Sequence, residues 1–283
     1  MINVDSFLKK GKQHFICEDY IINSDDRDTM PYIILSDGCS SSENTDIGSR
    51  VLVRSALNIL DEKLLYRFPD AELLVPNYWE FGRRIIEKAI GVIDSLRIQR
   101  TSLDATLIIA YVYKESVYVL IYGDGYIYFK NDDCDEINYV GIKYDKNAPY
   151  YLNYLMNKDR DLAYSKSQDK EFVTVIKGIC RIDTDDYIED LYKTDLLNND
   201  IFSYKIPIHS LDFIGVSSDG IESFMDNKGN SSNPKNIIKD FTSFKNTKGK
   251  FVKRRLNKAI SEYEMLNFNH LDDISFGCFH FGE

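Results

Sequence analysis

The feature that most constrains this chain is an apolar run ending in Ser-Asp-Gly, which occurs twice at distant places in the sequence. The runs are residues 32–38 (YIILSDG) and 213–220 (FIGVSSDG), and their short, β-branched-rich pattern predicts two buried strands. Asp37 and Asp219 therefore stand where a strand leaves the core. Gly38 lets the backbone turn sharply and present its carbonyl beside the Asp37 carboxylate. Such oxygens are the ligands that Mg²⁺, Mn²⁺ and Ca²⁺ prefer, although Asp-Gly is also a common turn dipeptide.

The composition indicates one globular domain that spans residues 1–283. Hydrophobic residues make up 43% of the chain and aromatic residues 13%, which is enough to bury a large core, and no repeat or low-complexity linker divides it. The formal net charge of −10 disfavours binding to nucleic acid or to an anionic membrane, because both attract basic surfaces. We therefore expect no nucleic-acid or membrane partner. The acidity itself fits either solubility or acids that converge on a metal.

The cysteines and the N-terminus favour a cytoplasmic protein. The five cysteines are odd in number, scattered and without a Cys-x-x-Cys pair, so neither a zinc site nor a redox dithiol is predicted. Reduced cysteines fit the cytosol. The first residues (MINVDSFLKKGKQHF) lack the apolar core of a signal peptide, and no apolar run is long enough to span a membrane. We expect a cytoplasmic monomer.

Two adjacent acids interrupt the first apolar segment. Residues 14–22 (HFICEDYII) are predicted as a first strand, whose alternation sends Glu18 and Asp19 to opposite faces. One of the two then points into a buried or ligand-filled region, where an unpaired carboxylate is too costly. An edge strand with both acids in water is the alternative.

Acids also mark the ends of two later strands. A hairpin over residues 104–122 ends in a Gly-Asp-Gly turn at Asp124, and a final strand over residues 272–281 opens with the pair Asp272-Asp273. Carboxylates gathered at strand ends repel one another unless divalent cations lie between them. Two hard cations bridged by Asp37 suit a hydrolytic site, in which a bridging water becomes acidic enough to attack a phosphoryl group.

Helical periodicity and one polar stretch account for the rest of the chain. Helices are predicted over residues 47–64, 78–97, 233–244 and 248–266. Residues 131–205 have weak periodicity and many Asp, Asn, Lys and Tyr residues, which predicts an irregular, flap-like region over the sheet. A short strand at residues 172–176 and a short helix near residues 151–157 are expected inside it.

Taken in order, these motifs resemble those of the metal-dependent protein phosphatases of the PP2C family. The matching segments are ICED at residues 16–19, the two Ser-Asp-Gly strands, the hairpin that ends in Gly-Asp-Gly, and the terminal DDIS at residues 272–275. Each motif is short, but five of them in this order are specific, and they extend over residues 14–281. The resemblance implies an α+β fold: a four-layer α-β-β-α sandwich with two central, mainly antiparallel sheets.

The resemblance also implies a site for two Mn²⁺ or Mg²⁺ ions at one end of the sandwich. Asp37 is expected to bridge both ions, with Glu18 and the Gly38 carbonyl on one of them. Asp219 and Asp272 are expected on the other ion, partly through water.

Further roles follow from the same resemblance. Asp19 is expected to orient metal-bound water, as a catalytic residue with Asp37. Asp272 is preferred to Asp273 as the ligand because the family's ligand is the first acid of that pair. Asp124 matches an acid sometimes associated with a third, weaker metal. Ser223 stands where the family has a further acid, four residues after the second Ser-Asp-Gly aspartate, which argues against that third ion.

Two departures from the family pattern concern phosphate and oxidation. The family's phosphate-binding Arg, four residues before the Glu, is His14 here; a protonated histidine can donate to phosphate but lacks the bidentate fork. A strand-edge histidine without a role is the alternative, and Arg50 or Arg54 is a candidate substitute. Cys39 stands beside the expected ligands, so its thiol is either oxidant-sensitive or simply a small residue that fits.

The activity implied by the resemblance is hydrolysis of phosphoserine and phosphothreonine in proteins, by direct attack of a metal-bridging water and without a phosphoenzyme. The expected partner is a phosphorylated protein substrate. Two alternatives stay open. One is a pseudophosphatase that binds a phosphoprotein without cleaving it, which His14 motivates. The other is a phosphatase of a small phosphorylated molecule.

Overall fold

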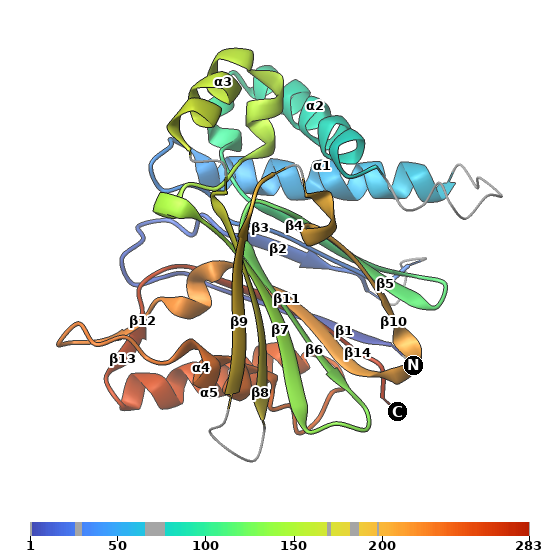
Figure 1. The fold of residues 1–283 in the computed structure, drawn as a ribbon, viewed down its shortest axis with the longest axis vertical. Coiled ribbons are helices and arrows are strands. Elements are labelled where there is room, and N and C mark those ends of the chain that lie inside the picture. Colours follow the sequence, from blue (N-terminus) through green and yellow to red (C-terminus); the bar gives the residue numbers. More distant parts are fainter. Residues whose placement is uncertain are drawn as a thin grey trace.

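The computed structural model contains two antiparallel sheets that pack face to face, with helices on both outer faces (Figure 1). It describes residues 2–25, 30–65, 77–168, 171–181, 187–196 and 198–282. The order of layers confirms the expected α+β fold, a four-layer α-β-β-α sandwich.

The smaller sheet has the strand order β10-β5-β4-β3-β2. Its strands are β2 (Tyr20–Asn23), β3 (Tyr32–Ser36), β4 (Leu107–Tyr113), β5 (Ser116–Tyr122) and β10 (Ser203–Pro207). Every residue of β3 is buried, because this sheet lies between helices and the second sheet. The predicted strand that ends before Asp37 is confirmed as β3, and the predicted hairpin is confirmed as β4 and β5, with Tyr113 paired to Ser116.

The larger sheet has the strand order β1-β14-β11-β6-β7-β8-β9. Its strands are β1 (Asn3–Lys9), β6 (Gly125–Asn131), β7 (Glu136–Tyr144), β8 (Val173–Arg181), β9 (Tyr187–Thr194), β11 (Leu211–Ser217) and β14 (Ile274–His280). A two-stranded ribbon, β12 (Phe224–Asp226) with β13 (Phe268–His270), lies beside it. The second predicted Ser-Asp-Gly strand is β11, and the predicted last strand is β14.

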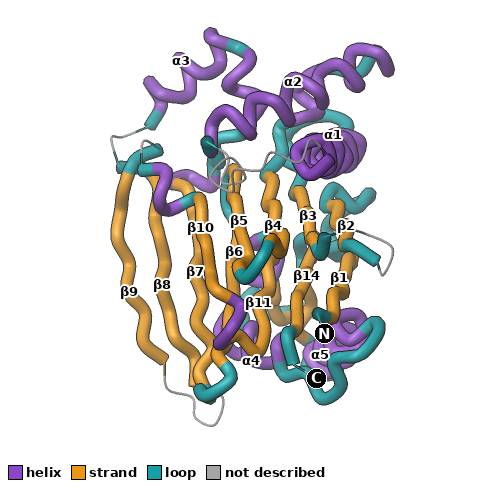
Figure 2. The backbone as a smooth tube through the Cα atoms, turned by 90° about the vertical axis from the view of Figure 1, so that its right-hand side faces the viewer, coloured by secondary structure: helices purple, strands orange, loops and turns teal. Residues whose placement is uncertain are grey.

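Helices lie on opposite sides of the paired sheets (Figure 2). They are α1 (Thr45–Leu65), α2 (Tyr78–Leu96), α3 (Lys158–Ser167), α4 (Pro234–Thr242) and α5 (Phe251–Met265). α1 packs on β2, β3 and β4, whereas α5 packs on β1 and β14. Four of the five match predicted helices, and α3 is additional. No helix in the described parts of the chain is long and apolar enough to cross a membrane.

The two sheets are closely packed where β14 meets β3. A Cβ added to Gly277 of β14 would lie 2.5 Å from Cγ2 of Ile33 in β3, so only glycine fits there. Ile33 and Ile34 are fully buried in an apolar core that includes residues of both sheets and of helices α1 and α2. A second apolar core lies between the larger sheet and helices α4 and α5. The close packing fixes the ends of β3 and β14 relative to one another, and these ends carry the site.

The strand predicted over residues 14–22 was wrong in extent, because β2 begins only at Tyr20. Residues 11–19 instead form turns and bends, so the alternation of Glu18 and Asp19 across a strand does not apply. β1 was missed because its core-facing side carries an acid: Asp5 is buried, and its carboxylate accepts from the backbone N–H of Lys253 at 3.0 Å.

The irregular region predicted over residues 131–205 was also wrong. It contains β7, β8, β9, β10 and α3, and the predicted short strand at residues 172–176 is part of the longer β8. β9 lacks an apolar pattern because it is the exposed edge of the larger sheet, where most of its residues meet solvent. The short helix expected near residues 151–157 is a 3-10 helix, Leu152–Met156.

Candidate active site

Four separate strand ends bring four carboxylates into one cleft of about 250 Å³. Asp37 follows β3, Asp124 joins β5 to β6, Asp219 follows β11, and Asp272 precedes β14. β11 and β14 are antiparallel neighbours, so the end of one meets the start of the other. The remaining lining residues are Gly38, Cys39, Ser40, Ser41, Thr106, Asn147, Pro149 and Tyr151.

The turn at Asp37 is fixed by the start of β4. The backbone N–H of Asp37 donates to Oγ1 of Thr106 at 3.1 Å, and the backbone N–H of Thr106 donates to the Asp37 carbonyl at 2.8 Å. A Cβ on Gly38 would lie 2.9 Å from Cβ of Thr45 and 3.0 Å from the Glu18 carbonyl. Glycine is therefore required by close packing at this corner.

The cleft concentrates negative charge. Burial, followed by the charges of Asp19 and Asp219, raises the pKa of Asp37 well above its ordinary value. Burial and the charge of Asp219 likewise raise the pKa of Asp124. None of the described residues that line the cleft is a lysine, arginine or histidine. The carboxylates thus need protons or bound cations to coexist.

Asp19 lies behind the cleft and is 1% exposed. Its Oδ2 accepts from Oγ of Ser218 at 2.8 Å, whereas Oδ1 is buried without a hydrogen-bond partner among the described residues. Burial is the main cause that raises the pKa of Asp19 to about 7. A buried carboxylate oxygen without a donor is the kind of atom that a bound water or ion would satisfy.

Glu18 does not line this cleft. Its carboxylate accepts from Oγ of Ser40 at 2.6 Å and from Oγ1 of Thr45 at 3.1 Å. With His14 and Ser40 it lines a neighbouring cavity of about 290 Å³. Of the predicted metal ligands, the structure therefore brings Asp37, Gly38, Asp219 and Asp272 together and leaves Glu18 on the far side of Ser40.

The two acids before β14 face different surroundings. Asp272 lines the cleft, and burial, followed by the charge of Asp219, raises its pKa. Asp273 is 1% exposed, and its carboxylate accepts from the backbone N–H groups of Gly11 and Glu18, each at 2.6 Å. Asp273 therefore ties the segment around residues 11–19 to the sheet.

His14 is engaged with acids. Its Nε2 lies 3.1 Å from Asp272 and its Nδ1 lies 3.1 Å from Asp273, with Glu18 at 3.6 Å. Burial alone would lower the pKa of His14, but the nearby carboxylates of Asp273, Asp272 and Glu18 raise it above its ordinary value. The imidazole is thus held beside the acids rather than among the residues that line the cleft.

The candidate substitute arginines contact Tyr20 and do not line the cleft. The Arg50 guanidinium lies 4.8 Å from the ring centre of Tyr20, and Arg54 donates to the Tyr20 hydroxyl at 3.1 Å. Glu222 pairs with Lys143 of β7, and Ser223 donates to the Gly220 carbonyl at 2.7 Å.

Sequence reasoning missed the contributions of residues 145–167. Asn147, Pro149 and Tyr151 reach the cleft from this segment. Tyr151 is 8% exposed, and burial, with the neighbouring Cys39 thiol, raises its pKa, so the hydroxyl stays protonated. The only signal in the sequence was the Ala-Pro turn at Pro149, which gives no indication of a contact with Asp37.

The carboxylates of the cleft are the type of ligand that a hard divalent cation prefers. Among the described residues, no three Asp, Glu, His or Cys side chains are gathered closely enough to hold an ion as they stand. Apart from the Cys39 thiol, the ligating side chains of the cleft are carboxylates, which repel one another, and Asp19 carries an unpartnered buried oxygen. Mg²⁺ and Mn²⁺ prefer such oxygen sets.

Solved structures similar to this chain share the fold. A serine/threonine phosphatase, Stp1 from Staphylococcus aureus, aligns with a TM-score of 0.57 at 15% identity, covering 100% of this chain and 96% of that one. A serine/threonine phosphatase from S. agalactiae aligns with a TM-score of 0.53 at 14% identity, covering 100% of both chains. A bacterial serine phosphatase gives 0.56 at 15% identity, covering 100% and 98%.

Comparison of sequences places the chain in a family. A search of curated proteins gives no match. The family model described as protein phosphatase 2C matches residues 10–261, which is most of the chain. The matched span includes Asp37, Asp124 and Asp219. The chain therefore belongs to the protein phosphatase 2C family.

Proposed function

We propose that this chain hydrolyses phosphoserine and phosphothreonine in proteins and needs two Mg²⁺ or Mn²⁺ ions to do so. The observation that carries the proposal is the meeting of four carboxylates in one cleft whose described lining has no cationic side chain. Membership of the protein phosphatase 2C family supports the reaction, and the solved relatives named as serine/threonine phosphatases support the substrate class.

The proposed ligands are the oxygens that converge in the cleft. Asp37 would bridge the two ions, with the Gly38 carbonyl on one side and Asp219 and Asp272 on the other. When bound, the ions would acidify a water molecule and offset charge on the phosphoryl group. Glu18 would be a more distant member of the set, because it does not line the cleft and its carboxylate accepts from Ser40 and Thr45.

Two further acids have proposed roles. Ser218 fixes Oδ2 of Asp19, so Oδ1 is the oxygen that would orient the attacking water. Asp124 lines the same cleft and would be the ligand of any third ion. Glu222 would not share that ion, because Lys143 already neutralises it.

Neutral donors would hold the substrate phosphate. His14 is occupied by Asp272 and Asp273, so it would contribute by keeping Asp272 in place rather than by binding phosphate. The hydroxyls of Ser41 and Thr106 line the cleft and can donate to phosphate oxygens, whereas Ser40 already donates to Glu18. Affinity for phosphate would then depend on the bound cations more than on a charged side chain.

The test is the activity of two isosteric variants. Asp37→Asn and Asp219→Asn should each abolish turnover of a phosphoserine peptide in the presence of Mn²⁺, because an amide is a poor bridging ligand. Their far-UV circular dichroism should match that of the wild type. Asp94→Asn, which changes an exposed carboxylate paired with Arg100, is the matched control and should keep full activity. Full activity in both cleft variants would refute the proposal.

A phosphoprotein-binding pseudophosphatase is the second candidate, and one observation favours it. The described residues that line the cleft include no phosphate-binding cation, because His14 faces the acids. A Mn²⁺ titration with p-nitrophenyl phosphate and with phosphopeptides separates the candidates. Peptide binding without turnover at any Mn²⁺ concentration would favour the pseudophosphatase. Turnover of the small ester with no turnover of peptides would favour a phosphatase of small molecules.

A further inference from the structure

A buried ion pair outside the carboxylate cluster joins two parts of the chain that meet at the cleft. Asp104 has a side chain that is 3% exposed, and both of its oxygens are bound by Arg160. Nη1 of Arg160 donates to Oδ1 at 2.9 Å and Nη2 donates to Oδ2 at 2.7 Å. Asn153 adds a hydrogen bond to Oδ1 at 2.9 Å, and Ser42 adds one to Oδ2 at 3.0 Å.

The partners of Asp104 come from two segments that both contribute residues to the lining of the cleft. Asn153 and Arg160 belong to residues 145–167, here named the capping segment, which also supplies Asn147 and Tyr151 to the cleft. Ser42 belongs to the loop that follows Asp37. The carbonyl of Asp104 also accepts from the N–H of Cys39 at 2.9 Å. One residue therefore anchors the capping segment and the loop beside Asp37 at the same point.

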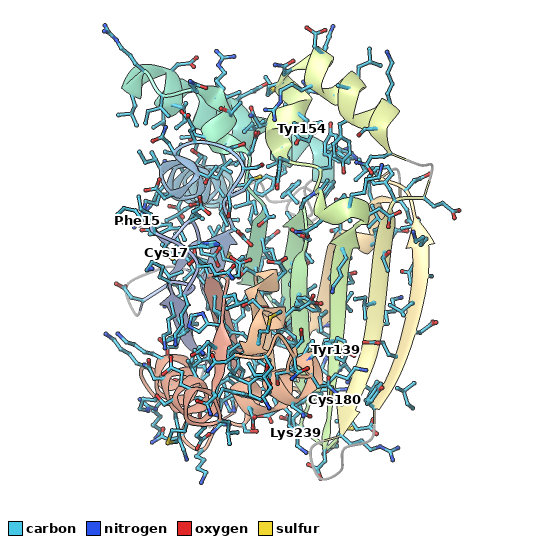
Figure 3. The ribbon with its side chains drawn as sticks, turned by 90° about the vertical axis from the view of Figure 1, so that its left-hand side faces the viewer. Phe15, Cys17, Tyr139, Tyr154, Cys180 and Lys239 are labelled. Carbon is cyan, nitrogen blue, oxygen red and sulfur yellow. The ribbon has the colours of Figure 1, made fainter. Side chains whose placement is uncertain are left out.

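Two further polar contacts hold the capping segment: Asn153 donates to the Arg100 carbonyl at 2.8 Å, and Lys193 pairs with Asp145 at 2.9 Å. Aromatic contacts add to these. Tyr154 lies beside α3 (Figure 3), with its ring 5.3 Å from that of Tyr164. The Arg160 guanidinium lies 4.6 Å from the centre of the Tyr154 ring. Tyr150 meets Trp79 of α2 edge-on at 6.0 Å. Ring contacts tolerate sliding, whereas a bidentate ion pair fixes direction and distance.

We infer that Asp104 and Arg160 are a positioning pair that sets the place of the capping segment, and with it of Tyr151, against the bound phosphate ester. The inference rests on the proposed phosphatase function. Tyr151 lines a cleft whose described lining has no basic side chain, and its hydroxyl is protonated, so its position matters for how the ester binds. A displacement of about 1 Å in such a donor can cost roughly 100-fold in rate.

The test compares two matched double variants. Asp104→Asn with Arg160→Met removes the pair without leaving a buried charge unpaired. Asp94→Asn with Arg100→Met removes an exposed bidentate pair of the same kind, with contacts at 2.9 and 2.6 Å. For p-nitrophenyl phosphate in Mn²⁺, the first variant should lose roughly 10- to 100-fold in kcat/KM, mainly through KM. The control should stay within about twofold of the wild type.

A second readout does not depend on activity. Trp79 is the only tryptophan in the chain and contacts Tyr150 of the capping segment, so its emission reports on that segment. The emission should change in the Asp104/Arg160 variant and not in the control. Amide hydrogen exchange should accelerate within residues 158–167. Arg160→Lys, which keeps the charge but not the fork, should give intermediate values and serves if the double variant does not fold.

The outcomes separate the inference from the function on which it rests. An inactive wild type would refute the phosphatase proposal, while emission and exchange would still show whether the pair holds the segment. An active wild type with an unchanged kcat/KM in the Asp104/Arg160 variant would overturn the inference. Loss of activity with unchanged emission and exchange would overturn it too, because the pair would then not act through the position of the segment.

Discussion

Asp272 and Asp273 are neighbours in the chain and have opposite surroundings. Asp273 is enclosed and accepts from two backbone N–H groups, those of Gly11 and Glu18. Asp272 lies in the cleft, where other carboxylates repel it. Two consecutive residues before β14 therefore have different roles. Asp273 holds the chain together, and Asp272 is available to a ligand.

The first prediction at this scale concerns stability. Asp273→Asn should lower the free energy of unfolding by about 2–3 kcal/mol, because backbone donors to a charged acceptor lose strength when the acceptor is neutral. Asp272→Asn should leave the stability of the metal-free protein unchanged or raise it, because it removes like-charge repulsion. Urea unfolding in the presence of a chelator measures both. Equal losses in the two variants would contradict the distinction.

At the scale of the element, one side chain of β11 adds to the backbone hydrogen bonds that join this strand to β6 and β14. Asp212 sits at an irregularity in the pairing of β11 with β6. Its carboxylate accepts from Lys130 of β6 at 2.9 Å and lies 3.0 Å from Nε2 of His280 in β14. The hydrogen bond from His280, followed by that from Lys130, lowers the pKa of Asp212 to about 2 despite its burial. The three strands meet at this carboxylate.

The prediction for β11 is a pH-dependent stability. Because the pKa of Asp212 is lower in the folded protein than in the unfolded chain, its contribution is present above about pH 4 and is lost as the pH falls toward 2. Asp212→Asn should therefore cost about 1–2 kcal/mol at pH 7, with allowance for partial solvent screening. The difference from the wild type should shrink below pH 4 in urea unfolding. A difference that is independent of pH would argue against the ion pair.

The sequence predicted the elements that a local residue pattern defines, and it missed those that have no such pattern. β3 was predicted because Pro31 and Asp37 enclose a continuous apolar run. β9 was not, because an exposed edge strand needs no apolar face. The Asp104–Arg160 pair joins residues 56 positions apart. A contact between residues so distant in the chain cannot be predicted from a local sequence pattern. The convergence of Asp37 and Asp219 was predictable because both end buried strands.

At the scale of the whole molecule, the site occupies the place where both sheets end together. Asp37 comes from the smaller sheet, whereas Asp219 and Asp272 belong to the larger one. Close packing between β3 and β14 fixes these ends, so the carboxylates cannot separate to relieve their repulsion. The metal-free protein therefore carries an electrostatic cost that ligand binding would remove.

For the whole molecule, we predict that bound metal stabilises the folded protein and that removal of one ligand reduces this stabilisation. Mn²⁺ at one hundred times its Kd should stabilise the wild type by about 2.7 kcal/mol, through binding to the folded state. Asp37→Asn should be more stable than the wild type in a chelator, because burial and four neighbouring carboxylates disfavour its charge. The same variant should lose most of the Mn²⁺-dependent rise in Tm. Thermal unfolding with and without Mn²⁺ measures both effects, and an undiminished rise would contradict the role of Asp37.

The position of β14 inside the larger sheet has a consequence for synthesis on the ribosome. Among the described strands, β14 comes latest in the sequence, yet it lies between β1, the earliest, and β11. A nascent chain that lacks it would expose the edges of both neighbours, which are sites for mispairing. Asp272, just before β14, would also emerge late. β1 therefore gains its neighbour in the sheet only after β14 has been synthesised. The carboxylate cleft is likewise complete only when translation of this region has ended.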